Sequence, residues 1–217
     1  MDERYIQQLL QQHDDDKKLT EKQARILIAA IEMFAKKGYF ATSTSEIAKA
    51  ASVAEGTIFR HYPSKKELLL AIVKPGVMKL AFPIFASDMA SKIFDQEFQS
   101  LDSMLRTFIK NRMEFVEDNL PLVKILLQEI AFHDEIKEIL GAAAHTYVLP
   151  RVKNLLDVCR KQNVVKDLPD ETLLRFIITN VLGFIVTRYL VFPDRDWNDE
   201  QEVENVVKLI IDGLRPS

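Results

Sequence analysis

The 217-residue sequence is poor in the residues that build several common kinds of site. It has a single cysteine, Cys159, which excludes an internal disulfide and favours a reducing, cytoplasmic setting. No zinc-ligand spacing, phosphate-binding loop or glycine-rich dinucleotide fingerprint occurs, and no polar cluster suggests catalysis. We therefore expect no cofactor, no metal ion and no enzyme activity.

A long, uninterrupted apolar run is also missing. The most apolar stretch, residues 176–192, contains Asn180 and Arg188, and it is too short and too polar to span a bilayer. The first twelve residues are polar and lack the apolar centre of a signal peptide. The sequence therefore predicts a cytoplasmic protein that does not bind a membrane, with residues 176–192 as a buried helix.

Charge is unevenly distributed along the chain, although the formal net charge is only -3. Residues 17–74 hold eleven basic and five acidic residues, whereas residues 1–16 and 75–217 are both net acidic. A positive block within an acidic protein is typical of a module that contacts a polyanion such as DNA. Chance variation along the chain is the alternative that charge alone leaves open.

Helical periodicity dominates the sequence, which predicts an all-α fold. Capping boxes at 20–23, 43–46 and 64–67, and a looser one at 198–201, each precede an apolar periodic run. Pro75 and Gly76 are expected to break or kink the helix that starts at residue 64. The other predicted helices are 24–37, 44–51, 54–62, 77–90, 101–118, 121–132, 134–162 with a bend near Pro150, 169–192 and 199–214.

Two short helices joined by a tight turn, at 44–51 and 54–62, form a helix-turn-helix pattern. The second helix of such a pair can enter the major groove of DNA, so its outer side should be small, polar or basic. Residues 55–57 (Glu-Gly-Thr) and 60–61 (Arg-His) meet that need. Val53, Ile58 and Phe59 are expected to pack inward.

The order of residues in this region is similar to that of a known family. Segment 26–39 resembles the first helix of the TetR/AcrR family of bacterial transcriptional regulators. Segment 42–53 resembles the second helix of that family and the turn after it. Segment 56–69 resembles its recognition helix and the start of the helix that follows. The resemblance covers about residues 20–72. It implies an N-terminal arm at 1–19, a helix-turn-helix DNA-binding domain at 20–63, and a larger helical domain at 64–217 that binds an effector and dimerises.

The resemblance also implies a set of DNA contacts. Lys65, at the N-terminus of the fourth helix, would bind phosphate with the help of that helix end. The chain departs from the family at Ser52, where glycine is usual and a strained backbone is expected. It departs again at Ala54, where the usual serine would provide a cap worth about 1 kcal/mol. The implied contact residues are Thr42, Ser45, Glu55, Gly56, Thr57, Arg60, His61, Tyr62 and Lys65.

Aromatic, methionine and polar residues of the C-terminal region are candidates for an effector site, with ordinary core as the alternative for each. Arg112 and Asn180 are expected to be polar anchors in a mostly apolar cavity formed between residues 77 and 192. The full candidate set is Phe82, Met89, Phe108, Arg112, Met113, Phe176, Asn180 and Phe184.

Two apolar stretches are candidates for a dimer interface. These are residues 176–192 and the stripe of Val203, Val206, Val207, Ile210 and Leu214 on the last helix. Paired across a two-fold axis, they would bury each other in a homodimer. Alternatively, both could close the core of one subunit.

These features together predict a dimeric transcriptional regulator. We expect a repressor that a small apolar or amphipathic effector releases from double-stranded operator DNA. The alternative is a DNA-binding protein of the same fold that is controlled by a protein partner or acts without a ligand. The two differ in whether the C-terminal domain holds a cavity.

Overall fold

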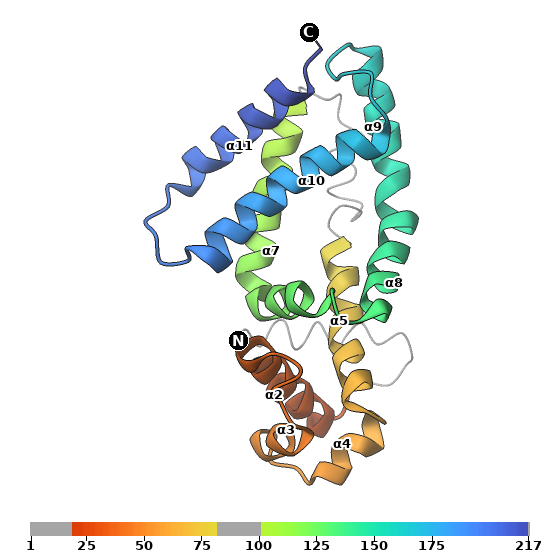
Figure 1. Cartoon of the computed structure of the whole chain (residues 1–217), viewed down its shortest axis with the longest axis vertical. Coiled ribbons are helices and arrows are strands. Elements are labelled where there is room, and N and C mark those ends of the chain that lie inside the picture. Colours follow the sequence, from red (N-terminus) through yellow and green to blue (C-terminus); the bar gives the residue numbers. More distant parts are fainter. Residues whose placement is uncertain (1–18, 82–100, 217) are drawn as a thin grey trace. The chain divides into compact units, whose positions relative to one another are not determined.

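The computed structural model describes residues 19–81 and 101–216, and the regular structure of these residues is entirely helical (Figure 1). The all-α prediction is thus confirmed for this part of the chain. Contacts divide the chain into two compact units. Unit 1 comprises residues 1–80 and 118–143, and unit 2 comprises residues 81–117 and 144–217. The predicted domain boundary after residue 63 falls inside unit 1.

Unit 1 begins with three helices that pack on one another: α2 (Glu21–Lys37), α3 (Thr44–Ala50) and α4 (Glu55–His61). Helices α2 and α3 start with complete capping boxes, at Thr20 and Ser43, as predicted. Each box satisfies backbone N–H groups that the first helical turn leaves without a partner. The core of this group consists of fully buried apolar side chains, among them Ile26, Ile31, Phe34, Ile47 and Ile58.

Helix α5 (Lys65–Ala81) passes through Pro75 without interruption, so a break, one of the two outcomes predicted there, is wrong. Proline removes one backbone donor from the helix, but Val73 and Val77 are buried before and after it and hold both parts in the core. Gly76 lies against Leu122, where an added Cβ would come within 2.4 Å of the leucine Cδ2. This glycine therefore permits close packing within unit 1.

Helix α7 (Leu101–Glu129) is bent, because the backbone of Asn119 is not helical (φ −128°, ψ 26°). Pro121 follows two residues later and cannot donate a hydrogen bond to the preceding turn. The bend agrees with the prediction of separate helices at 101–118 and 121–132. It lies next to the division between the units, so that α7 gives its first part to unit 2 and its last part to unit 1, where α8 (Asp134–Ala143) follows.

Unit 2 also contains α9 (Leu149–Lys161), α10 (Asp170–Val186) and α11 (Asp199–Leu214), and α10 packs against both of the others. Two π-helical turns, Ala144–Val148 and Thr187–Val191, precede α9 and extend α10. The first of them separates α8 from α9 within the stretch 134–162 that was predicted as one helix with a bend near Pro150. Arg106 of α7 joins Glu204 of α11 by a two-pronged ion pair, with Nε 2.5 Å from Oε1.

The apolar stripe of α11 lies in the core of unit 2, where Val203, Val207, Ile210 and Leu214 are all buried. This supports the alternative in which the stripe closes the core of one subunit.

Helix α10 differs from α11, because its apolar residues Ile178 and Leu182 remain exposed, and Val191 and Phe192 are exposed just beyond it. By length and composition alone, Asp170–Val191 could cross a membrane. Within it, however, Arg188 is held by Asp199 in a two-pronged ion pair, with Nε 2.7 Å from Oδ1.

Candidate DNA interface and effector cavity

Helix α4 combines a buried apolar side with an outer side of small, polar and basic residues. Ile58 is fully buried, while Glu55, Gly56 and Arg60 are exposed and Thr57 is partly exposed. No atom lies within 4 Å of the position where a Cβ would stand on Gly56. The backbone at this point can therefore be approached closely by a large partner such as a DNA strand.

The start of α4 is fixed to the start of α3 by one hydrogen bond. The hydroxyl of Thr44 donates to Oε1 of Glu55 over 2.6 Å. Ser45, the next residue, is exposed beside this contact. The structure thus brings Ser45 and Glu55, both predicted contact residues, to one end of the helix pair. His61, also predicted, is partly exposed at the other end of α4.

Two of the predicted DNA contacts have buried side chains. The hydroxyl of Thr42 donates to the carbonyl oxygen of Gly38 over 2.9 Å, which closes the turn before α3. Tyr62 is buried, and burial raises the pKa of its phenol to about 12. The side chains of Thr42 and Tyr62 therefore do not face solvent, contrary to the contacts predicted for them, because both are used in packing unit 1.

Phe59 is 43% exposed, so the prediction that it packs inward is wrong. The core side of this short helix is formed by Ile58 and, directly after the helix ends, by the C-cap residue Tyr62. Successive residues on a helix are rotated by about 100°, and this rotation turns Phe59 away from the core. Its ring therefore lies on the outer surface next to Arg60.

The turn between α3 and α4 has the two features that its departures from the TetR/AcrR pattern predict. Ser52 adopts a left-handed backbone with φ of 54°, a conformation that is strained for a residue with a side chain. Ala54 is the N-cap of α4 and provides no side-chain hydrogen bond to the helix. The geometry of the turn is thus retained at some loss of stability.

The caps of α3 and α4 provide a paired prediction on stability. Ala54→Ser is expected to raise the free energy of unfolding by about 1 kcal/mol, because its hydroxyl can accept an N–H of the first turn. Ser43→Ala should lower it by a similar ~1 kcal/mol, because Ser43 already accepts from the Glu46 N–H. Urea unfolding of the three proteins measures both changes. An Ala54→Ser variant no more stable than the parent would contradict the capping argument.

Lys65 is the first residue of α5, close to the end of α4, and its side chain packs against other residues of unit 1. Its Nζ lies 4.2 Å from the centre of the Tyr39 ring, and partial burial lowers the pKa of its ammonium group. The Tyr39 backbone N–H in turn donates to Glu129 Oε1 over 3.2 Å, and the ring meets His133 edge-on. The last part of α7 therefore fixes the position of Tyr39, and Lys65 packs against the ring of Tyr39.

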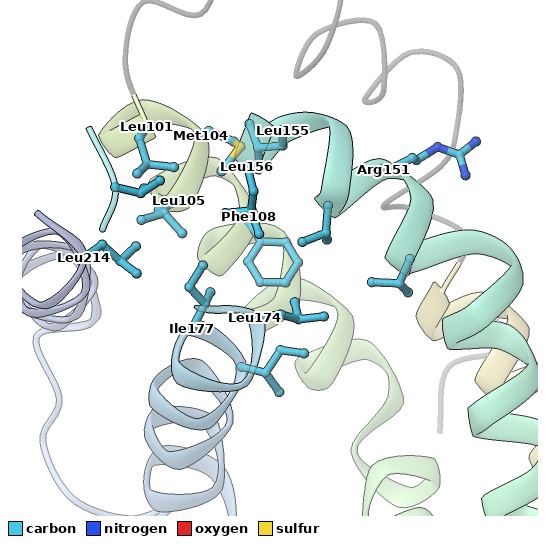
Figure 2. Close-up of a pocket in the computed structure, with 14 residues that line it drawn as sticks. Leu101, Met104, Leu105, Phe108, Arg151, Leu155, Leu156, Leu174, Ile177 and Leu214 are labelled. Atoms are coloured by element: carbon cyan, nitrogen blue, oxygen red, sulfur yellow. The ribbon is translucent and has the colours of Figure 1, made fainter. Parts of the chain in front are cut away.

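A partly open cavity of about 130 Å³ lies in unit 2, and the exposed Ile178 is at its edge (Figure 2). Helices α7, α9 and α10 form its walls, together with the end of α11. Among the described residues, no polar atom faces its interior. Its lining residues are Leu101, Met104, Leu105, Phe108, Val148, Arg151, Val152, Leu155, Leu156, Val165, Leu174, Ile177, Ile178 and Leu214.

Of the predicted effector residues, Phe108 lines this cavity, and its ring projects among the other lining side chains (Figure 2). Phe82 and Met89 lie outside the described residues. Arg112 is buried one helical turn beyond Phe108, with its guanidinium 5.8 Å from that ring, and burial lowers its pKa to about 10. It is not one of the residues that line the cavity.

The other predicted effector residues are used elsewhere in unit 2. Asn180 donates from its side chain to the carbonyl oxygen of Phe176 on its own helix over 2.8 Å. Phe176 lies against Gly213, Phe184 meets Trp197 edge-on, and Met113 is buried. None of these residues lines the cavity, because helix α10 turns Leu174, Ile177 and Ile178 toward it instead.

Most of the cavity was missed from the sequence, although one signal was present. Leu101, Met104, Leu105 and Phe108 follow the i, i+3, i+4, i+7 spacing of a single helix face. That spacing indicates a buried face but does not distinguish the wall of a cavity from filled core. The contribution of α9, through residues 151–156, depends on how the helices pack.

Comparison with known proteins agrees with this arrangement. Residues 26–72 match the family described as bacterial regulatory proteins, tetR family. The uncharacterized HTH-type transcriptional regulator YvkB of Bacillus subtilis (strain 168) is 51% identical over 49 residues, which is 23% of this chain and 26% of that protein. The chain thus carries a DNA-binding region of the tetR type at residues 26–72. Its match to YvkB and to two further Bacillus subtilis regulators spans only 26%, 19% and 18% of their lengths.

Other TetR-type relatives cover nearly the whole chain at lower identity. The fatty acid metabolism regulator protein of Bacillus subtilis (strain 168) is 24% identical over 205 residues, 89% of this chain and 95% of that protein. The crystal structure of FadR from Bacillus subtilis in complex with stearoyl-CoA has a TM-score of 0.67 at 20% identity and covers 88% of this chain and 98% of that one. The structure of FadR from Bacillus halodurans has a TM-score of 0.69 at 21% identity, and the match covers 93% of this chain and 100% of that one. These structures show that the fold of this chain is shared beyond the helix-turn-helix.

Proposed function

We propose that this protein is a TetR-family repressor that binds double-stranded operator DNA as a homodimer and is released by a small apolar or amphipathic effector. The outer side of α4 carries the proposal. It places Thr57 and Arg60 on an exposed helix face whose opposite side is anchored in the core by Ile58. A rigid helix with such a face can enter the major groove and contact base edges.

The start of α5 adds a phosphate site to this face. Lys65 and Lys66 occupy the first turn of the helix, where positive charge opposes the helix dipole. A phosphate bound there would interact favourably with the free N–H groups of the helix end and with the ammonium of Lys65. Lys66 is already paired with Glu135, with Nζ 2.5 Å from Oε1, which leaves Lys65 as the better candidate.

The cavity in unit 2 favours ligand control over control by a protein partner. An apolar cavity is a site for a small molecule, because filling it adds contacts that the empty protein lacks. The relative crystallised with stearoyl-CoA bears a hydrocarbon chain on its ligand, which is compatible with an apolar effector here. The effector of this chain would accordingly be apolar over the part that it buries.

Helix α7 offers a physical route from effector to DNA. Its first part lines the cavity through Phe108, and its last part ends at Glu129, which holds the Tyr39 loop of the DNA-binding region. The bend at Asn119 lies between them. An effector that shifts the first part of α7 would alter the position of Tyr39 and Lys65. A coupling of about 1–3 kcal/mol would change DNA affinity roughly 5–150-fold.

The experiment that tests the function is selection of duplexes from a random pool, followed by affinity measurements over a range of salt concentrations. Lys65→Ala is expected to weaken binding to all sequences alike and to reduce the salt slope by about 1. Thr57→Ala should instead change which sequences are preferred. Lys110→Ala, an exposed change on α7, serves as the control for loss of one positive charge. If the intact protein prefers no duplex, the proposed function fails.

A further inference from the structure

We propose that the cavity of unit 2 binds a compact, uncharged hydrocarbon of about the size of a benzene ring, and that Phe108 sets this size limit. The inference rests on the proposed function and adds to it the chemical class of the effector and a residue that selects it. It chooses an apolar effector over an amphipathic one, which the proposed function leaves together.

The volume of the cavity limits the size of the ligand. An apolar cavity of roughly 150 Å³ in another protein, lined by leucine, isoleucine and phenylalanine, stays dry and binds benzene. The cavity here measures about 130 Å³, and side chains of the same kinds line most of it. A single ring is therefore of suitable size, whereas a long acyl chain would leave most of its length in water at the open edge beside Ile178.

The lining of the cavity disfavours a charged or strongly polar ligand. Among the described residues no polar atom faces the interior, so a buried hydroxyl or carboxylate would lose its hydrogen bonds to water without replacement. Arg151 is the one charged residue in this lining, and its guanidinium points away from the other lining side chains (Figure 2). Its Nη1 donates to the carbonyl oxygen of Tyr147 over 3.0 Å. Arg151 therefore offers the cavity only its apolar stem.

Two other cations that neighbour lining residues in the sequence are also held by the protein itself. Arg106 pairs with both Asp102 and Glu204, at nitrogen–oxygen distances of 2.7 and 2.5 Å. Lys166 donates from its ammonium group to the carbonyl oxygen of Gly213 over 2.8 Å. An anionic ligand would have to compete with these contacts, whereas a neutral hydrocarbon leaves all of them in place.

Phe108 determines how large the hydrocarbon can be. Its ring projects among the other lining side chains (Figure 2), and the guanidinium of the buried Arg112 lies 5.8 Å from the centre of that ring. This cation–π contact resists displacement of the ring. Replacement of Phe108 by alanine would join the volume of the ring to the cavity, so that a second ring would fit. Tryptophan, which is larger, would instead reduce the space left for a ligand.

The charge of the ligand is tested by calorimetric titration of the full-length protein with benzene and with benzoate, which differ by one carboxylate. Benzene is expected to bind at least about tenfold more tightly, because the carboxylate would either enter apolar surroundings or hold the ring at the open edge. Arg151→Gln should leave this order unchanged. Equal or tighter binding of benzoate, or a failure of benzene to bind at all, overturns the proposal.

The size limit is tested by the rise in melting temperature that benzene and naphthalene cause at equal concentrations, since a ligand of the folded state stabilises it. Benzene should give the larger rise in the parent protein, and Phe108→Ala should reverse this order. Phe108→Trp should reduce the rise with benzene, which places the ligand in this cavity. Phe108→Leu covers the case in which the alanine variant does not fold, and Phe176→Ala, outside the lining, should keep the parent order.

Two results would overturn the size limit. One is a parent protein that naphthalene stabilises more than benzene, and the other is the parent order in both the alanine and the leucine variants of Phe108. DNA affinity without ligand, measured on the same proteins, separates these results from a failure of the proposed function. A protein that prefers no duplex contradicts the proposed function, whereas one that binds its operator but not benzene contradicts only this inference.

Discussion

Leu182→Glu is expected to convert the protein to a monomer and to weaken its binding to a two-site operator by roughly 10²–10⁴-fold. Leu182 is 44% exposed on α10, and Ile178, Val191 and Phe192 are exposed with it. In a two-fold interface built on this surface the substitution would appear twice and would bury two carboxylates in apolar surroundings. Each subunit alone would then bind only one half-site, without the gain from the linked second site.

Light scattering and affinity for one and two half-sites measure the two parts of this prediction. Val158→Glu on α9 is the matched control, because Val158 is 40% exposed and the same charge is introduced on another helix. Val207→Glu and Ile185→Lys are unsuitable, since both residues are buried in the core of unit 2 and would report on folding. A dimeric Leu182→Glu protein would remove α10 from the proposed interface.

Features fixed by local interactions could be predicted from the sequence. The capping boxes at Thr20 and Ser43 involve partners three residues apart, so a short pattern contains the whole interaction. The strained turn at Ser52 and the missing cap at Ala54 also depend on a few neighbouring residues. For the same reason, the start of α11, with Asn198 accepting from the Gln201 N–H, agrees with its prediction.

Features that depend on distant residues could not be predicted in the same way. Phe59 lies in α4 and Tyr62 is the C-cap residue of that helix, and only the three-dimensional core decides that Tyr62 is buried and Phe59 exposed. The cavity requires side chains from Leu101 to Leu214, and the sequence does not specify how closely their helices approach. Arg112 is buried, yet the cavity wall lies one turn before it, at Phe108.

Gly76 gives the sharpest contrast between a sequence interpretation and the packing. Beside a proline, it was interpreted as a site of helix breaking or bending, and an alanine there should then stiffen α5 and add up to about 1 kcal/mol of stability through helix propensity. In the structure, an alanine Cβ would lie 2.4 Å and 2.7 Å from the two terminal carbons of Leu122, a fully buried side chain. We therefore expect Gly76→Ala to destabilise the protein by about 1–3 kcal/mol through overpacking.

Two further variants isolate this steric effect. Gly141→Ala on α8 is the control, because no atom lies within 4 Å of an added Cβ there, and it should raise stability by up to about 1 kcal/mol. Leu122→Val should lower stability in the parent protein by removing buried volume, but it should cost less in the Gly76→Ala background, where it makes room for the new methyl group. A double-mutant cycle from urea unfolding gives that coupling directly. Stabilisation by Gly76→Ala would mean that α5 and the last part of α7 can separate at little cost, and that this glycine serves flexibility.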